Sequence, residues 1–136
     1  MKAVVDTNVL AYYLLGTPQF AGEARSLLGS TAEILAPSLW EAELANVIWM
    51  AERARVITAQ EAPARLALAA RLGVRSVPVR TLWHGALVRS LQSNVAVYDT
   101  LFVELAERER VMLATFDRGL MRAFPKLAKR PRELER

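Results

Sequence analysis

Four acidic residues stand at positions where carboxylates can do chemistry: Asp6, Glu43, Asp99 and Asp117. Asp6 directly follows the apolar residues 3–5, and Asp117 follows the largely apolar residues 111–115 after one position. Both runs are typical of buried strands. Ligands bind outside the carboxyl ends of the strands in an open parallel sheet, so both residues are candidates for a site. For either residue alone, however, helix N-capping is the better explanation.

Glu43 is more informative, because it lies inside an expected helix, 38–54, where capping does not explain it. Its neighbours at helical spacing are Leu39, Trp40, Asn46 and Val47. Since most of these are apolar, we expect Glu43 to face inward or to line a cleft, where a carboxylate needs a partner or a metal. The alternative is a buried ion pair with an arginine.

Glu41 provides a contrast with Glu43. It lies two residues away on another face of the helix, and a capping box with Ser38 accounts for it.

Asp99 opens an expected helix, 99–109, and as a lone residue could be a cap or a favourable charge in the first turn. If the four acids converge, their repulsion is substantial: two carboxylates about 4 Å apart repel by about 4 kcal/mol at an effective dielectric of about 20. Such a cluster implies raised pKa values or bound cations. The chain has no cysteine and one histidine, His84, so carboxylates would be the main ligands. That donor set favours Mg²⁺ or Mn²⁺, which can activate a water for phosphodiester hydrolysis.

The composition fits one globular domain, 1–136, with 53% hydrophobic residues and a net charge of +4. The basic excess is compatible with nucleic acid, although ordinary surface charge is the better explanation of this charge taken alone. We expect a cytoplasmic protein without a membrane segment, because no apolar run is long enough for a signal peptide or a bilayer span. Residues 126–136 form a basic tail that could lie on the surface, fray or contact a partner.

Expected strands alternate with expected helices along the chain, which predicts an α/β fold with a mostly parallel central sheet and helices on both faces. Capping boxes mark helix starts at Ser38 and Thr58. Further expected elements are two strands at 33–36 and 77–79; Pro78 suggests an edge or strand-start position for the latter. Five more helices are expected at 9–15, 19–28, 58–73, 81–92 and from 117 to before 125.

Four segments together resemble the successive signatures of the PIN domain family: residues 4–8 (VVDTN), Pro37 with 43–46 (ELAN), 98–101 (YDTL) and 114–117 (ATFD). The resemblance runs from the first strand to about Leu120. The length and single-domain form look most like the VapC toxins of toxin–antitoxin pairs.

This resemblance implies a PIN-like domain that acts as a Mg²⁺- or Mn²⁺-dependent endoribonuclease. In the family pattern, Asp6, Glu43, Asp99 and Asp117 match the catalytic, metal-ligating acids. Supporting polar positions are matched by Thr7, Asn8, Asn46 and Thr115. The resemblance also implies an RNA substrate, a homodimer and a cognate VapB-type antitoxin.

Several further residues have two interpretations. Arg118 and Arg122 lie at four-residue spacing after Asp117 and could grip RNA phosphate; solvated surface charge, or a salt bridge to an acid of the site, explains them equally well. Tyr12 and Tyr13 could stack on bases, although core packing is expected for at least one of them.

The helices within 9–28 and 38–54 could offer an apolar groove to a partner helix. Its expected contributors are Trp40, Trp49 and Met50, of which at least one tryptophan is expected in the core.

Two other functions remain open at the level of sequence. The first is a phosphoaspartyl phosphatase-like enzyme with Asp6 as nucleophile. Asn8 argues against it, since a second acid is expected two residues after the nucleophile. The second is a non-catalytic α/β binding module in which the acids are caps and ion pairs.

Overall fold

A computed structural model describes residues 1–135. Its centre is a five-stranded, all-parallel sheet in the order β3-β2-β1-β4-β5. The strands are β1 (Lys2–Val5), β2 (Glu33–Pro37), β3 (Arg75–Val77), β4 (Met112–Ala114) and β5 (Ala128–Lys129). The chain therefore begins in the middle of the sheet, builds outward to β3, and then crosses to the other side of β1.

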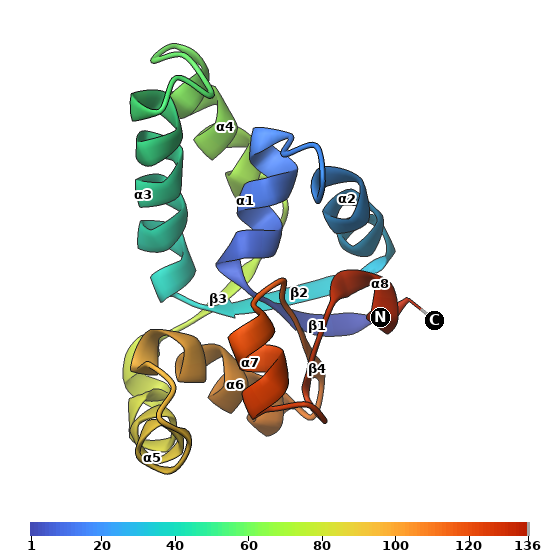
Figure 1. The fold of residues 1–136 in the computed structure, drawn as a ribbon, viewed down its shortest axis with the longest axis vertical. Coiled ribbons are helices and arrows are strands. Elements are labelled where there is room, and N and C mark those ends of the chain that lie inside the picture. The colour runs from blue at the N-terminus through green and yellow to red at the C-terminus, as the bar shows by residue number, and fades with distance from the viewer. Residues whose placement is uncertain (136) are drawn as a thin grey trace.

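Helices cover both faces of the sheet, as the sequence predicts (Figure 1). One layer holds α1 (Thr7–Leu15), α2 (Ala21–Ser30), α3 (Leu39–Arg53) and α4 (Glu61–Ala70). The opposite side holds α5 (Trp83–Ser93), α6 (Val97–Glu109) and α7 (Arg118–Ala123), and α8 (Pro131–Leu134) follows β5. None of the helices in residues 1–135 has both the length and the apolar character needed to cross a bilayer.

The core lies on both sides of β1, β2 and β4, whose residues are almost entirely buried. This burial explains why the strands read as continuous apolar runs rather than as alternating patterns. Trp40 is also buried, and its indole Nε1 donates to Ser76 Oγ at 2.7 Å, so core packing is confirmed for this tryptophan. Trp49 and Met50 are exposed on α3.

Some helix and strand limits differ from the sequence prediction. The third strand is Arg75–Val77 rather than 77–79, although its edge position is confirmed; Pro78 cannot donate to a ladder and instead precedes a 3₁₀ turn, Val79–Thr81. The second helix is Ala21–Ser30 rather than 19–28. The sixth helix begins at Val97, so Asp99 lies in its first turn.

The two predicted capping boxes have different outcomes. At α4, Thr58 N donates to Glu61 Oε1 at 2.9 Å and Glu61 N donates to Thr58 Oγ1 at 3.1 Å, which confirms that box. At α3, Ser38 has helical backbone angles and makes no side-chain cap bond, so that prediction is wrong. Glu41 is exposed and is not explained by capping.

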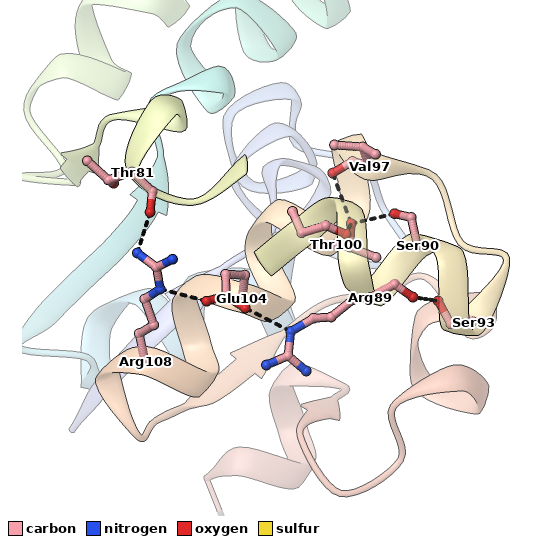
Figure 2. Close-up of polar contacts among 9 residues, drawn as sticks. Thr81, Arg89, Ser90, Ser93, Val97, Thr100, Glu104 and Arg108 are labelled. Atoms are coloured by element: carbon pink, nitrogen blue, oxygen red, sulfur yellow. Dashed lines mark hydrogen bonds and ion pairs between the residues drawn. The ribbon is translucent and has the colours of Figure 1, made fainter. Parts of the chain in front are cut away.

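A buried carboxylate joins α5 to α6 (Figure 2). Glu104 of α6 accepts hydrogen bonds from Arg89 Nε at 3.0 Å and from Arg108 Nε at 2.6 Å, and Arg108 also reaches Thr81 O. One helical turn earlier, Thr100 Oγ1 donates to Ala86 O at 2.8 Å. These contacts fix α5 on α6, the helix that carries Asp99.

Candidate active site

Asp6 lies at the carboxyl end of β1, at the point where the chain order of the sheet changes direction between β1 and β4. Its backbone N donates to Ala114 O at 2.9 Å, which ties it to β4. Asp6 occupies the N-cap position of α1 but makes no side-chain cap bond, so capping does not account for it. Open parallel sheets bind ligands at such switch points.

Asp6 is only 7% exposed, and its carboxylate is held by polar neighbours. Thr115 Oγ1 donates to its Oδ2 at 2.8 Å, and Asn8 Nδ2 lies 3.4 Å from the same oxygen. Burial raises the pKa of Asp6 to about 7; the Thr115 bond lowers it, whereas the charges of Asp99 and Glu43 raise it further. The side chain is therefore poised to change charge near neutral pH.

Glu43 is half-buried on α3 and faces α1. Its Oε1 accepts a hydrogen bond from Thr7 Oγ1 at 2.7 Å, and no arginine in the described chain pairs with it. Burial raises the pKa of Glu43, the Thr7 bond lowers it and the Asp99 charge raises it. The ion pair with an arginine considered for Glu43 is therefore wrong.

Asp99 and Asp117 complete the acidic group from the other side of the sheet. Burial and the charge of Asp117 raise the pKa of Asp99. Asp117 is the N-cap of α7, because its Oδ1 accepts from Leu120 N at 2.9 Å; capping is thus confirmed for this residue alone of the four. Its own backbone N donates to Thr115 Oγ1 at 2.9 Å, so Thr115 links Asp117 to Asp6.

All four acids border one cleft of about 300 Å³. The cleft lies between the α1–α3 layer and the helices α6 and α7. Its lining residues are Asp6, Thr7, Asn8, Ala11, Tyr12, Glu43, Val47, Asp99 and Asp117. The structure thus brings together the acids that sequence spacing singled out, from segments more than a hundred residues apart.

The donor set of this cleft fits a hard divalent cation. Its acidic residues all contribute carboxylates, and burial with mutual repulsion raises the pKa of three of them, a penalty that a cation would relieve. Within residues 1–135, no group of three or more His, Asp or Glu side chains is already arranged to hold a metal ion. Mg²⁺ needs no such cage, since it often uses one or two carboxylates together with water and substrate phosphate.

Of the other predicted site residues, Asn8 belongs to the site and Asn46 does not. Asn8 joins the site, because its Oδ1 accepts from Phe116 N at 3.3 Å and its Nδ2 lies 3.4 Å from Thr115 Oγ1. Asn46 does not line the cleft; it is exposed, and its amide contacts Met50 Sδ at 3.6 Å. Its i+3 spacing from Glu43 turns it toward solvent, whereas Val47 at i+4 lines the cleft.

Arg118 and Arg122 are exposed on α7, and neither has an ion-pair partner among the described residues.

The sequence analysis did not predict an aromatic cluster beside the cleft, where Tyr12, Phe20 and Phe116 meet. No short-range pattern links these three positions. The only sequence signal near them was the presence of Asp6 before Tyr12 and of Asp117 after Phe116.

Comparison with known proteins agrees with this geometry. The family model of the PIN domain matches residues 3–127. The chain belongs to the PIN domain family. A similar curated relative is Ribonuclease VapC3 of Mycobacterium tuberculosis, 30% identical over 124 residues that cover 91% of this chain and 88% of the relative. This match places the chain among the VapC-type PIN domains.

Solved structures show the same PIN fold. The crystal structure of VapBC2 from Rickettsia felis bound to a DNA fragment from their promoter aligns with a TM-score of 0.66 and 14% identity, over 96% of this chain and 98% of that one. A toxin–antitoxin complex from Klebsiella pneumoniae aligns with a TM-score of 0.65 and 18% identity, over the same shares of the two chains.

Proposed function

We propose that this PIN domain is a metal-dependent endoribonuclease and the toxin of a type II toxin–antitoxin pair. The observation that carries the proposal is the acidic cleft at the β1–β4 switch point, where Asp6, Glu43, Asp99 and Asp117 border one cavity. The name of the VapC3 relative supports RNA as the substrate. An arrangement of caps and ion pairs, as in a non-catalytic binding module, would not leave three of these acids with raised pKa values.

The residues of the chain have separable tasks in this proposal. Asp6 and Asp99 are the best candidates for direct metal contact, and a bound Mg²⁺ or Mn²⁺ would supply charge neutralisation and a more acidic water. Thr7 orients Glu43, and Thr115 orients both Asp6 and Asp117 through the bonds described above. Arg118 and Arg122 are available to contact backbone phosphates beside Asp117.

An RNA cleavage assay with and without chelator tests the proposal. We expect single-stranded or structured RNA to be cut with Mn²⁺ or Mg²⁺, and Asp99→Asn to lose at least a hundredfold in rate. Glu41→Gln is the matched control, because Glu41 is an exposed acid two residues from Glu43 and outside the cleft. Wild-type protein that leaves RNA intact with either metal, or cuts it equally well in chelator, would contradict the proposal.

We further propose a VapB-type antitoxin as partner. Solved neighbours are described as VapBC2 and as a toxin–antitoxin complex, which supports it. The apolar groove that suits an amphipathic helix lies between α3 and α4, and not between α3 and the helices within 9–28 as the sequence suggested. Of the expected contributors, Trp49 lines this groove, whereas Trp40 and Met50 do not. Co-expression with the product of a short adjacent reading frame should abolish RNA cleavage; undiminished cleavage by a co-purified pair would argue against the antitoxin.

A homodimer is the second proposed assembly. Trp83, Leu87 and Leu91 are at least half exposed and follow one another at four-residue spacing on α5, which makes an apolar stripe on this helix. Sedimentation equilibrium should give twice the mass of the chain, and a monomer at micromolar concentration would exclude the assembly.

A further inference from the structure

Three aromatic rings meet beside the acidic cleft. Tyr12 of α1 stacks on Phe20 with ring centroids 4.5 Å apart and planes at 22°. Phe116, between Thr115 and Asp117, meets Tyr12 edge-on at 5.3 Å and Phe20 at 5.0 Å. The cluster therefore joins α1, the residue that precedes α2 and the loop after β4. Of these, α1 directly follows Asp6, and Thr115 of the loop donates to the Asp6 carboxylate.

The C-terminal part of the chain holds this cluster in place. The Arg130 guanidinium lies over Phe116 at 5.5 Å and over Phe20 at 5.9 Å. Glu23 of α2 fixes the arginine, with Arg130 Nε 3.0 and 2.9 Å from its two carboxylate oxygens. Phe116 is anchored separately through its backbone bond to Asn8. Tyr12 is consequently braced by two rings that are themselves fixed.

Tyr12 is the aromatic residue among those lining the cleft. Phe20 stacks on one face of its ring and Phe116 meets it in a T-shaped arrangement, and Tyr12 also borders the same cavity as the four acids. An acidic cavity repels the phosphates of RNA, so ordered binding needs an uncharged contact as well as cations. An aromatic ring held rigidly beside the reacting group can supply that contact by stacking on a base.

We propose that Tyr12 determines substrate class by stacking on an unpaired base next to the phosphate that is cut. The proposal rests on the proposed function for the identity of the polymer as RNA. It predicts a preference for single-stranded or looped RNA, because a base paired within a helix cannot offer its face to a ring inside the cleft. Phe20, Phe116 and Arg130 act as positioning residues that keep the ring in place.

The test separates stacking from mere packing through the choice of variants. Tyr12→Phe keeps the ring and should behave as wild type, whereas Tyr12→Leu keeps bulk but removes the stacking face. Tyr13→Leu is the matched control, because Tyr13 packs against the core and does not line the cleft. Melting temperatures of all three establish that the proteins are folded.

Binding is measured in the Asp99→Asn background, so that RNA is not consumed. Single-stranded oligonucleotides carry 2-aminopurine at successive positions, and stacking quenches its fluorescence. We expect quenching at one position with Tyr12 and with Tyr12→Phe, and its loss in Tyr12→Leu. In the active enzyme, Tyr12→Leu should raise KM by about tenfold or more with a smaller change in kcat. Equal quenching by Tyr12→Leu, or an equal loss in Tyr13→Leu, overturns the proposal.

A second measurement needs no variant of the protein. An abasic nucleotide is moved stepwise through the RNA, and wild-type enzyme should lose about tenfold in kcat/KM at the stacked position only. If no abasic position weakens binding or cleavage, stacking by Tyr12 is excluded even where Tyr12→Leu fails to fold. If wild type binds and quenches RNA but never cuts it with Mn²⁺, the proposed ribonuclease function fails while the stacking site stands.

Discussion

At the scale of single residues, the charge of the cleft near neutral pH depends on the protonation of Asp6. Its pKa rises to about 7 chiefly because it is buried at the end of β1, and the neighbouring acids increase this effect. Hydrogen bonds from the Thr115 side chain and from the Thr7 backbone lower its pKa without supplying a positive charge. Asp6 is thus destabilising when ionised in the metal-free protein, which is typical of a group retained for function rather than stability.

This leads to a pH prediction for metal-free protein in chelator. Below pH 3.8, Asp6 is protonated in both the folded and the unfolded chain. As the pH rises toward 7, the unfolded chain releases the proton while the folded chain retains it, so the free energy of unfolding falls. Each tenfold difference in proton affinity corresponds to about 1.4 kcal/mol.

Urea unfolding of wild type and Asp6→Asn between pH 4 and 8 measures this effect. Because asparagine does not ionise, the variant should gain stability relative to wild type as the pH rises, and the difference should level off above about 7. Carboxyls outside the cleft, such as Glu23 with its lowered pKa, cancel in the comparison, whereas the coupling of Asp6 to Glu43 and Asp99 forms part of the measured difference. Parallel stability curves for the two proteins would contradict the interpretation.

At the scale of elements, the α5–α6 pair depends on the absence of a side chain at Gly85. A Cβ at this position would overlap the carboxyl group of Glu104, which Arg89 and Arg108 hold in place (Figure 2). The glycine is therefore required by packing rather than by backbone conformation. No feature of the sequence around Gly85 marked it as special, since its partner lies on another helix.

We expect Gly85→Ala to lower the free energy of unfolding by about 1–3 kcal/mol, as overpacking typically does. Gly29→Ala is the control, because Gly29 is also helical and an added Cβ meets nothing within 4 Å. That control should be neutral or slightly stabilising, in line with the greater helix propensity of alanine. Chemical denaturation of both variants measures the free energy of unfolding. Equal values would mean that the Glu104 side chain moves aside at no energetic cost.

The C-terminal segment shows the largest difference between expectation and structure at this scale. Its basic composition left open whether it lies on the surface, frays or contacts a partner. In the described residues, Ala128–Lys129 instead forms the fifth strand beside β4, and Glu23 accepts from both Arg130 and Arg132 N. The segment thereby supports the loop that carries Phe116 and Asp117.

At the scale of the whole molecule, the parallel sheet order brings the acids together. Asp6 and Asp117 follow the adjacent strands β1 and β4, while α3 and α6 bring Glu43 and Asp99 from opposite faces. Each acid alone is only weak evidence for a functional site. Their convergence is stronger evidence, because it concentrates negative charge that only protons or cations can offset.

A bound cation should therefore stabilise the whole fold. If Mn²⁺ binds the folded cleft and not the unfolded chain, its concentration at a hundred times the dissociation constant adds about 2.7 kcal/mol. We expect the melting temperature of wild type to rise by several degrees with Mn²⁺, and that of Asp99→Asn to change much less. Glu41→Gln should respond as wild type does. A melting temperature indifferent to Mn²⁺ would speak for the non-catalytic binding module.

The sequence by itself determined the α/β class, the buried strands and the four acids, because these depend on local hydrophobic runs and on spacing along one helix or one strand end. It also determined the Thr58–Glu61 capping box, whose partners are three residues apart. Only the tertiary structure decided that Thr7 and not an arginine holds Glu43, that Asn46 faces away from the cleft, and that Tyr12 lines it. These outcomes depend on how helices rotate and pack against one another, and contacts between residues far apart in the chain leave no periodic trace in the sequence.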